Sequence, residues 1–173
     1  MVKIFTAYAN KFLILNSDKV PCALGKEGVI TADRKREGDL RSPAGIWRLK
    51  YIFYRPDRLQ APDTVLPVIA LTPEDGWCDA PDHPDYNRHV KLPFDASHEK
   101  LWREDHIYDL IGILGHNDDP PVAGMGSAIF LHLARENYVG TEGCVALSQP
   151  DLLELLRQAE AETYIEISKD DAA

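Results

Sequence analysis

The chain has 173 residues, 45% of them hydrophobic, with 19 Lys and Arg against 28 Asp and Glu and a formal net charge of −9. This length and composition predict one globular domain over residues 1–173, because a single core usually serves roughly 100 to 200 residues. The acidic balance argues against nucleic acid or an anionic membrane as the main partner, since both attract clustered Lys and Arg. No apolar run approaches the roughly 18 residues of a membrane-spanning helix, so we expect no membrane segment.

The first 24 residues predict a β-hairpin and no export signal. Asn16-Ser17-Asp18 is a turn signal between the apolar run 12–15 and the segment 19–24. The run 12–15 is too short for the hydrophobic region of a secretory signal. We therefore expect a cytoplasmic protein, or a periplasmic one if a leader precedes the given chain.

The middle of the chain predicts loops and isolated strands. Residues 26–43 are polar and contain a run of charges, which is typical of a solvated loop. Residues 44–53 alternate as a strand does. Seven prolines between Pro56 and Pro93 exclude a long helix there and leave 65–71 as a short edge strand. Ser97 is a candidate N-cap for a short helix over 97–103.

The last third predicts two central strands, one helix and a final strand. Segments 108–114 and 128–133 are apolar enough to be buried strands. Ser148, Pro150 and Asp151 form a helix start, and leucines then recur with helical spacing, which predicts a helix over about 149–161. A strand at 163–167 and a frayed tail at 169–173 complete the chain. The fold class is therefore α+β and mainly β, with one clear helix near the C-terminus.

The three cysteines, Cys22, Cys78 and Cys144, form an odd set and predict no disulfide framework. Cys22 lies in an apolar string and is interpreted as a buried hydrophobic residue. Cys78, His83 and His89, with three interspersed aspartates, are of the types that bind zinc, but their spacing fits no standard finger. We assign no metal and no cofactor, and interpret this segment as a proline-rich loop or a lid that carries Trp77 and Tyr86.

A histidine and a cysteine near the C-terminal third could carry chemistry. His132 ends a predicted strand, and Cys144 follows twelve residues later, directly after Gly143. An imidazole beside a thiol can accept its proton and stabilise the thiolate as an ion pair. The N–H groups of Gly143 and Cys144 could then meet the charge that develops on a substrate carbonyl. Spacing alone is weak evidence, because His and Cys occur a dozen residues apart by chance in many chains; on that ground a buried histidine and a buried cysteine without a catalytic role are favoured.

Together, Gly126-Ser127, the strand ending at His132 and Thr141-Glu142-Gly143-Cys144-Val145 resemble the signature of the L,D-transpeptidase (YkuD-like) catalytic domain family. The upstream segment 38–47 resembles that family's Thr/Ser-Pro-x-Gly stretch, so the resemblance extends from about residue 38 to 157. It implies mixed β-sheets with few helices, a nucleophile at Cys144 and a general base at His132. The family's histidine is usually oriented by a backbone carbonyl; Asp118 and Asp119 are other candidates for that role.

Two positions depart from the family pattern, namely Glu142 and Ala146. Many members carry a basic residue at the first of these positions and an Arg or Asn at the second. Glu142 should raise the pKa of the neighbouring thiol, which predicts a pH optimum on the alkaline side of neutral. Four residues are candidates for substrate binding, namely His116, Ser127, Thr141 and Glu142.

The resemblance implies action on peptidoglycan stem peptides, at the bond between the L-centre of the diamino acid and the terminal D-alanine. We expect an L,D-carboxypeptidase that trims cytoplasmic muropeptides. One alternative is an L,D-transpeptidase that forms cross-links or exchanges D-amino acids in cell-wall biogenesis. Another is a non-catalytic module that binds peptidoglycan or a protein. The oligomeric state and the preferred diamino acid stay open.

Overall fold

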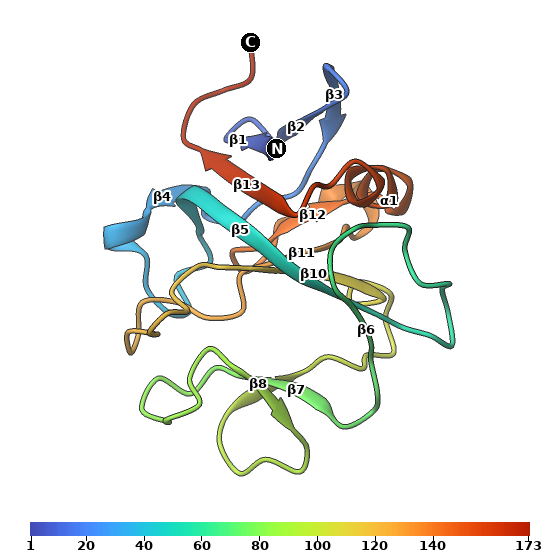
Figure 1. Ribbon diagram of the computed structural model, residues 1–173. Helices are drawn as coiled ribbons and strands as arrows, with labels where there is room; N and C mark the ends of the chain where they lie inside the picture. The colour runs from blue at the N-terminus through green and yellow to red at the C-terminus, as the bar shows by residue number, and fades with distance from the viewer.

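The computed structural model describes residues 1–173, and it is mainly β with a single α-helix near the C-terminus, as predicted (Figure 1). A large mixed sheet has the strand order β12-β11-β10-β5-β13-β1-β2-β3, with β4 and β6 also paired to β5, and a small sheet has the order β8-β7-β9. The strands are β1 (Val2–Tyr8), β2 (Phe12–Leu15), β3 (Asp18–Pro21), β4 (Val29–Thr31), β5 (Ser42–Tyr54), β6 (Val68–Ala70), β7 (Asp75–Cys78), β8 (His89–Lys91), β9 (His98–Lys100), β10 (Leu110–Leu114), β11 (Phe130–Leu133), β12 (Val145–Leu147) and β13 (Glu162–Ser168). No helix in it is long and apolar enough to cross a membrane.

The long strand β5 organises the large sheet. It pairs antiparallel with β10 on one side and β13 on the other, while β4 runs parallel to its first residues and β6 to its last. The alternation at 44–53 therefore predicted a real strand, which the structure extends by a few residues. The hairpin of β2 and β3, the edge strand β6, and the strands β10, β11 and β13 are also confirmed, with bounds shifted by a few residues.

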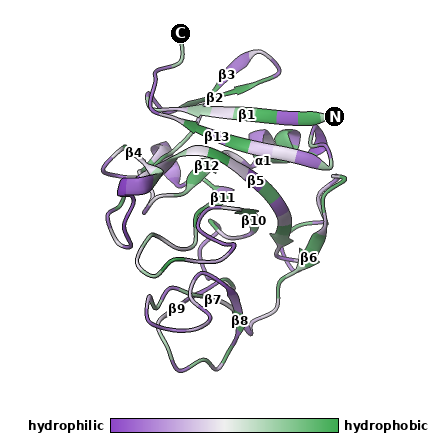
Figure 2. Ribbon diagram, turned by 60° about the vertical axis from the view of Figure 1, so that its left-hand side comes forward, coloured by the Kyte–Doolittle hydropathy of each residue, from purple (hydrophilic) through white to green (hydrophobic).

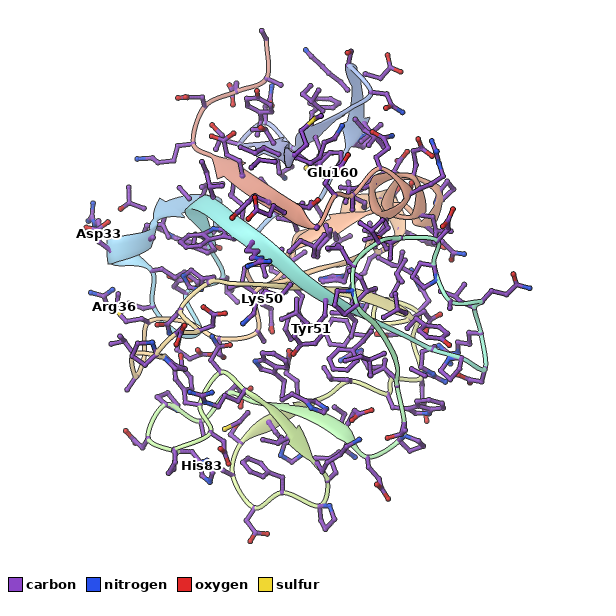
Figure 3. The ribbon with its side chains drawn as sticks, in the orientation of Figure 1. Asp33, Arg36, Lys50, Tyr51, His83 and Glu160 are labelled. Atoms are coloured by element: carbon purple, nitrogen blue, oxygen red, sulfur yellow. The ribbon has the colours of Figure 1, made fainter.

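Two apolar clusters occupy opposite faces of the inner strands. On β10, Leu110 and Leu114 belong to the larger cluster, whereas Ile111 and Ile113 belong to a second cluster of 10 residues beside the small sheet. Figure 2 shows the strands of the large sheet above those of the small sheet. The second cluster, with residues of β5, β7, β10 and β11, forms the layer that joins them. In Figure 3 the side chain of Tyr51 extends from β5 into the same layer, where it packs against the second cluster. Alternation along a strand thus gives β10 and β11 two buried faces.

Helix α1 (Gln149–Arg157) covers the face of the larger cluster. Ser148 caps it, because its Oγ accepts from the N–H of Asp151 at 3.3 Å and donates to the Asp151 carboxylate at 2.6 Å. Leu152, Leu155 and Leu156 are buried in the cluster. The helix ends four residues before the predicted position 161, because the chain must straighten to enter β13, which pairs with β1 along seven residues.

The helix predicted at 97–103 is wrong. Residues 98–100 form β9, which pairs antiparallel with β7, and pairing with a neighbour outweighs the local cap signal of Ser97. The predicted loop 26–43 contains β4 and a 3₁₀ turn, Ala32–Arg34. Sequence reasoning also missed five strands. Four of them, β4, β7, β8 and β12, have only three or four residues, too few for a clear alternation. The fifth, β1, has seven residues, but its apolar neighbours Ile4 and Phe5 interrupt the alternation.

Candidate active site

A cavity of about 320 Å³ brings five of the predicted site residues together. Cys144 and His132 lie in it, as do Ser127, Thr141 and Glu142. Its wall comes from three parts of the chain: the segment before β5, the small sheet with the residues after it, and the stretch from Ser127 to β12. The volume is sufficient for the end of one peptide.

Cys144 directly precedes β12 and is only 6% exposed. Its Sγ accepts from the N–H of Phe130 at 3.3 Å and donates to the carbonyl oxygen of Ala128 at 3.2 Å. Burial raises the pKa of the thiol to about 12; the Phe130 N–H opposes this shift, while the carboxylates of Glu99 and Glu142 add to it. The thiol is therefore protonated at neutral pH.

His132 lies on β11, the parallel neighbour of β12, opposite Ala146 in the register. Since side chains alternate along a strand, the register places His132 on the same face as Cys144. The His132 Nδ1 lies 2.9 Å from the carbonyl oxygen of Leu133; a carbonyl only accepts, so Nδ1 carries the proton and Nε2 is left as the acceptor. Burial lowers the pKa of His132 to about 4, so the imidazole is neutral at pH 7.

The orienting group of His132 is thus a backbone carbonyl. Asp118, a candidate for that role, instead pairs with Lys50 of β5 at 2.7 Å. Burial favours the neutral forms of both groups in the free protein, and the thiol donates to the carbonyl oxygen of Ala128. The arrangement suits a neutral thiol that transfers its proton to His132 as it attacks.

Gly143 and Thr141 shape the loop that carries the cysteine. Gly143 has φ +140°, and a Cβ there would lie 2.8 Å from the carbonyl oxygen of Arg41. Its N–H donates to the Thr141 Oγ1 at 3.1 Å, and that hydroxyl donates to the carbonyl oxygen of Cys144 at 2.7 Å. The hydroxyl of Thr141 is therefore used within the loop. Of the two amides expected to meet an oxyanion, Gly143 N–H is engaged and Cys144 N–H has no protein acceptor.

Ser127 joins a polar wall of the cavity that the sequence did not indicate. Its hydroxyl donates to the Glu37 carboxylate at 3.0 Å, and the hydroxyl of Tyr86 donates to the same carboxylate at 2.6 Å. Lys35, only 2% exposed, also lines the cavity and pairs with Asp39. Both Lys35 and Glu37 belong to a charge run that was interpreted as a solvated surface, because a sequence pattern does not show which charges a fold buries.

His116 does not line the cavity. It is 4% exposed and lies edge-on to Trp47 at 4.8 Å between ring centroids. Its Nδ1 is buried without a hydrogen-bond partner, and burial lowers its pKa to about 4. This placement gives His116 a packing role beneath the site and no direct contact with a ligand in the cavity. Glu142, by contrast, is exposed at the cavity wall beside Cys144.

The proline-rich segment forms a wall of the cavity. Asp79 follows β7 and Glu99 lies on β9, and both face the cavity together with Arg103 and Tyr108. This wall is held by Asn87, which is buried and was missed in the sequence. The side chain of Asn87 accepts from Trp77 Nε1 and from the N–H of Ala128, both at 3.0 Å, and donates to the carbonyl oxygens of His116 and Asn117.

The side chains that suggested a zinc site, those of Cys78, His83 and His89, do not converge on one point. Cys78 is fully buried in β7, while His89 pairs with Asp75 at 2.8 Å. His83 lies on the loop after β7, at the outer side of the small sheet (Figure 3), where its ring contacts Phe94. All three cysteines are free thiols, and Cys22 is buried in the larger cluster, as expected.

The cavity thus contains a buried cysteine, an imidazole oriented by a carbonyl and an unpaired amide, which are the groups that cysteine acyl transfer requires. A profile of the YkuD family, described as the L,D-transpeptidase catalytic domain, matches residues 4–167. The chain therefore belongs to the YkuD family of L,D-transpeptidase catalytic domains, a family that acts on peptidoglycan.

Structural comparison finds the crystal structure of the helical cell shape determining protein Pgp2 from Campylobacter jejuni, with 13% sequence identity and a TM-score of 0.41. A second structure, of a Pgp2 point mutant, has 13% identity and a TM-score of 0.39. Each match covers 99% of this chain but only 49% and 48% of Pgp2, so the chain spans about half the length of that protein. No curated protein sequence matches the chain.

Proposed function

We propose that the protein is a cysteine L,D-carboxypeptidase, which removes the terminal D-alanine from peptidoglycan stem peptides. The observation that carries this proposal is the cavity in which the Cys144 thiol lies on the same face as His132, with Nε2 of His132 and the amide of Cys144 both free of protein partners. Membership of the YkuD family supports the substrate class.

The proposed reaction uses the neutral forms of both groups. The Cys144 thiol leaves its contact with Ala128 and attacks the carbonyl carbon of the L-centre, while its proton passes to His132 Nε2. The oxyanion accepts from the Cys144 N–H. The imidazolium then protonates the amine of D-alanine, which leaves, and a thioester forms on Sγ. Water, deprotonated by His132, attacks the thioester and releases the shortened peptide and the thiol.

Hydrolysis is preferred over cross-linking because of the size of the cavity. A volume of about 320 Å³ is at the lower end for small-molecule sites and suits the end of one stem peptide. When D-alanine departs, water fills the space that it leaves. The proposal includes a cytoplasmic location, with soluble muropeptides as substrates; fractionation of cells that express the native gene tests this part.

The test is product analysis of a purified disaccharide tetrapeptide by mass spectrometry, with and without an added D-amino acid. The proposal expects loss of the terminal D-alanine in both samples, and no loss with Cys144→Ala. Dimers or exchanged termini as the main products would instead establish a transpeptidase. If wild type changed no stem peptide in any sample, a binding module would replace the proposed enzyme.

A further inference from the structure

Four carboxylates line the cavity without an ion-pair partner, namely Glu37, Asp79, Glu99 and Glu142. Glu37 accepts from the hydroxyls of Tyr86 and Ser127 instead. The cations of the cavity are mostly engaged elsewhere. Lys35 pairs with Asp39, while Arg103 and Arg135 pair with Asp105 at 2.7 and 3.5 Å. The remaining one, Lys26, packs on Gly140 and pairs with none of the four carboxylates. None of these carboxylates therefore forms an ion pair in the free protein.

Two of these carboxylates, Asp79 and Glu99, lie together at the small-sheet wall. The backbone N–H of Asp79 bonds to Ser97 at the entry to β9, and Glu99 is the middle residue of that strand. The Asp79 Oδ1 is shielded from solvent and has no hydrogen-bond partner. Glu99 accepts only from the hydroxyl of Tyr108, at 3.0 Å. An unsatisfied buried acceptor costs free energy, so its retention beside a cavity indicates a role toward a ligand.

The electrostatics of Glu99 agree with an uncompensated site. Burial raises the pKa of its carboxyl to about 7; the hydroxyl of Tyr108 and the charge of Arg103 oppose this shift, while the charges of Asp79 and Glu142 add to it. A bound cation would relieve this penalty.

The acidic wall lies close to the proposed chemistry. Tyr108, which donates to Glu99, places its ring edge-on to His132, with 5.4 Å between the ring centroids. One side chain therefore separates Glu99 from the proposed general base. The acidic wall and Cys144 line the same cavity, so one ligand can contact both.

We propose that Asp79 and Glu99 bind the free side-chain ammonium of the diamino acid in the stem peptide. This inference rests on the proposed function and names a substrate preference within it. A primary ammonium has three donors, which suits two carboxylates with free acceptor positions. The enzyme therefore selects stem peptides whose side-chain amine is free over those in which a cross-link or an acyl group blocks that amine.

Binding to the Cys144→Ala variant tests the preference without turnover. The two ligands are a tetrapeptide with a free side-chain amine and the same peptide with that amine acetylated, titrated by calorimetry. We expect the free amine to bind at least tenfold more tightly. Glu99→Gln and Asp79→Asn in the same background should each reduce this preference severalfold and leave the affinity for the acetylated peptide nearly unchanged.

Glu74→Gln is the matched control, because Glu74 is exposed just before β7 and does not line the cavity. It should keep the full preference. Equal binding of the two peptides, or a preference that survives both cavity variants, would overturn the inference.

The ammonium could also belong to an incoming acceptor amine, and hydrolysis distinguishes this source. Trimming needs no acceptor, so acetylation of the donor amine should lower kcat/KM for D-alanine release by wild type about tenfold. If acetylation leaves trimming unchanged, the donor ammonium is not recognised, although the proposed function stands. If wild type trims neither peptide, the proposed function fails, and the calorimetric preference still decides whether the wall binds an ammonium.

Discussion

The proposed nucleophile, Cys144, lies in surroundings that keep it protonated. Burial is the largest cause of its raised pKa, and the carboxylates of Glu99 and Glu142 act in the same direction. The proposed base, His132, is held neutral by burial as well. Burial therefore favours a protonated thiol and a neutral imidazole in the free protein, and a protonated thiol is the less nucleophilic form.

The contribution of Glu142 is measurable through alkylation. Glu142→Gln removes a negative charge near Sγ, which lowers the pKa of the thiol and increases the thiolate fraction at a given pH. Alkylation of Cys144 by iodoacetamide at pH 8 should become about two- to tenfold faster, as followed by mass spectrometry of the Cys144 peptide. The exposed control Glu74→Gln should leave the rate unchanged, and an equal rate in Glu142→Gln would refute the electrostatic role.

Glu99 should reduce the stability of the free protein at alkaline pH. Its pKa is about 7 in the fold against an ordinary 4.5, so its protonated form is favoured by the fold and stability is lost as the pH rises through 7. Glu99→Gln should therefore raise the free energy of unfolding at pH 8, on the order of 1 to 3 kcal/mol, and change it little at pH 4. Urea unfolding at the two pH values measures this, and a loss of stability at pH 8 would be the contrary result.

At the scale of elements, the site depends on contacts between segments far apart in the chain. Ser42, the first residue of β5, is fully buried; its Oγ accepts from the N–H of Gly25 at 2.9 Å and donates to the carbonyl oxygen of Gly143 at 2.8 Å. One hydroxyl thereby joins the start of the central strand to the loop of the nucleophile.

Removing this hydroxyl should loosen the loop. Ser42→Ala leaves a buried donor and a buried acceptor unpaired, which costs on the order of 1 to 3 kcal/mol in unfolding free energy. The proposed D-alanine release should also fall, since Gly143 and Cys144 lose their anchor. Denaturant unfolding and a kinetic assay measure the two effects, with the exposed Ser97→Ala as control. Wild-type stability in Ser42→Ala would show that the contact does not hold the loop.

The sequence predicts the elements with a strong local pattern better than those without one. The alternation of 44–53 and the capped, leucine-spaced helix are local signals, and both are confirmed. The small sheet is not local, because β7 acquires its partners from β8 and β9 in a proline-rich stretch. Cys144 and His132 were found from the family signature. Asn87, Lys35, Glu37 and Glu99 were missed, because their roles arise only when separate segments meet.

At the scale of the whole molecule, the cavity lies where the large sheet meets the small one. The second apolar cluster joins the two, with Trp77 of β7 placed edge-on to Phe130 of β11 at 5.0 Å between ring centroids. Cys144 belongs to this cluster. The layer therefore supports both the packing of the small sheet and the position of the thiol.

Two buried neutral histidines should make the molecule sensitive to acid. His116 and His132 have pKa values of about 4 in the fold against an ordinary 6.5. The unfolded chain therefore binds more protons, and stability that is present above pH 6.5 is lost as the pH falls toward 4, by up to about 3 kcal/mol for each histidine. Protonation of Glu99 acts in the opposite direction.

A variant isolates the histidine contribution. His116→Leu removes the buried imidazole that lies outside the cavity and leaves His132 in place. The loss of stability between pH 7 and pH 4.5 should therefore be smaller than in wild type. Urea midpoints at the two pH values give this difference. An unchanged difference would mean that His116 accepts its proton without opening the fold.

The measurement that tests the central claim most directly is the release of D-alanine from a disaccharide tetrapeptide by wild type and by Cys144→Ala. Both proteins are first shown to be equally folded by circular dichroism. The account predicts stoichiometric release by catalytic amounts of wild type and at least a thousandfold slower release by the variant, in line with the loss of a catalytic nucleophile. Release at the wild-type rate by Cys144→Ala would contradict it.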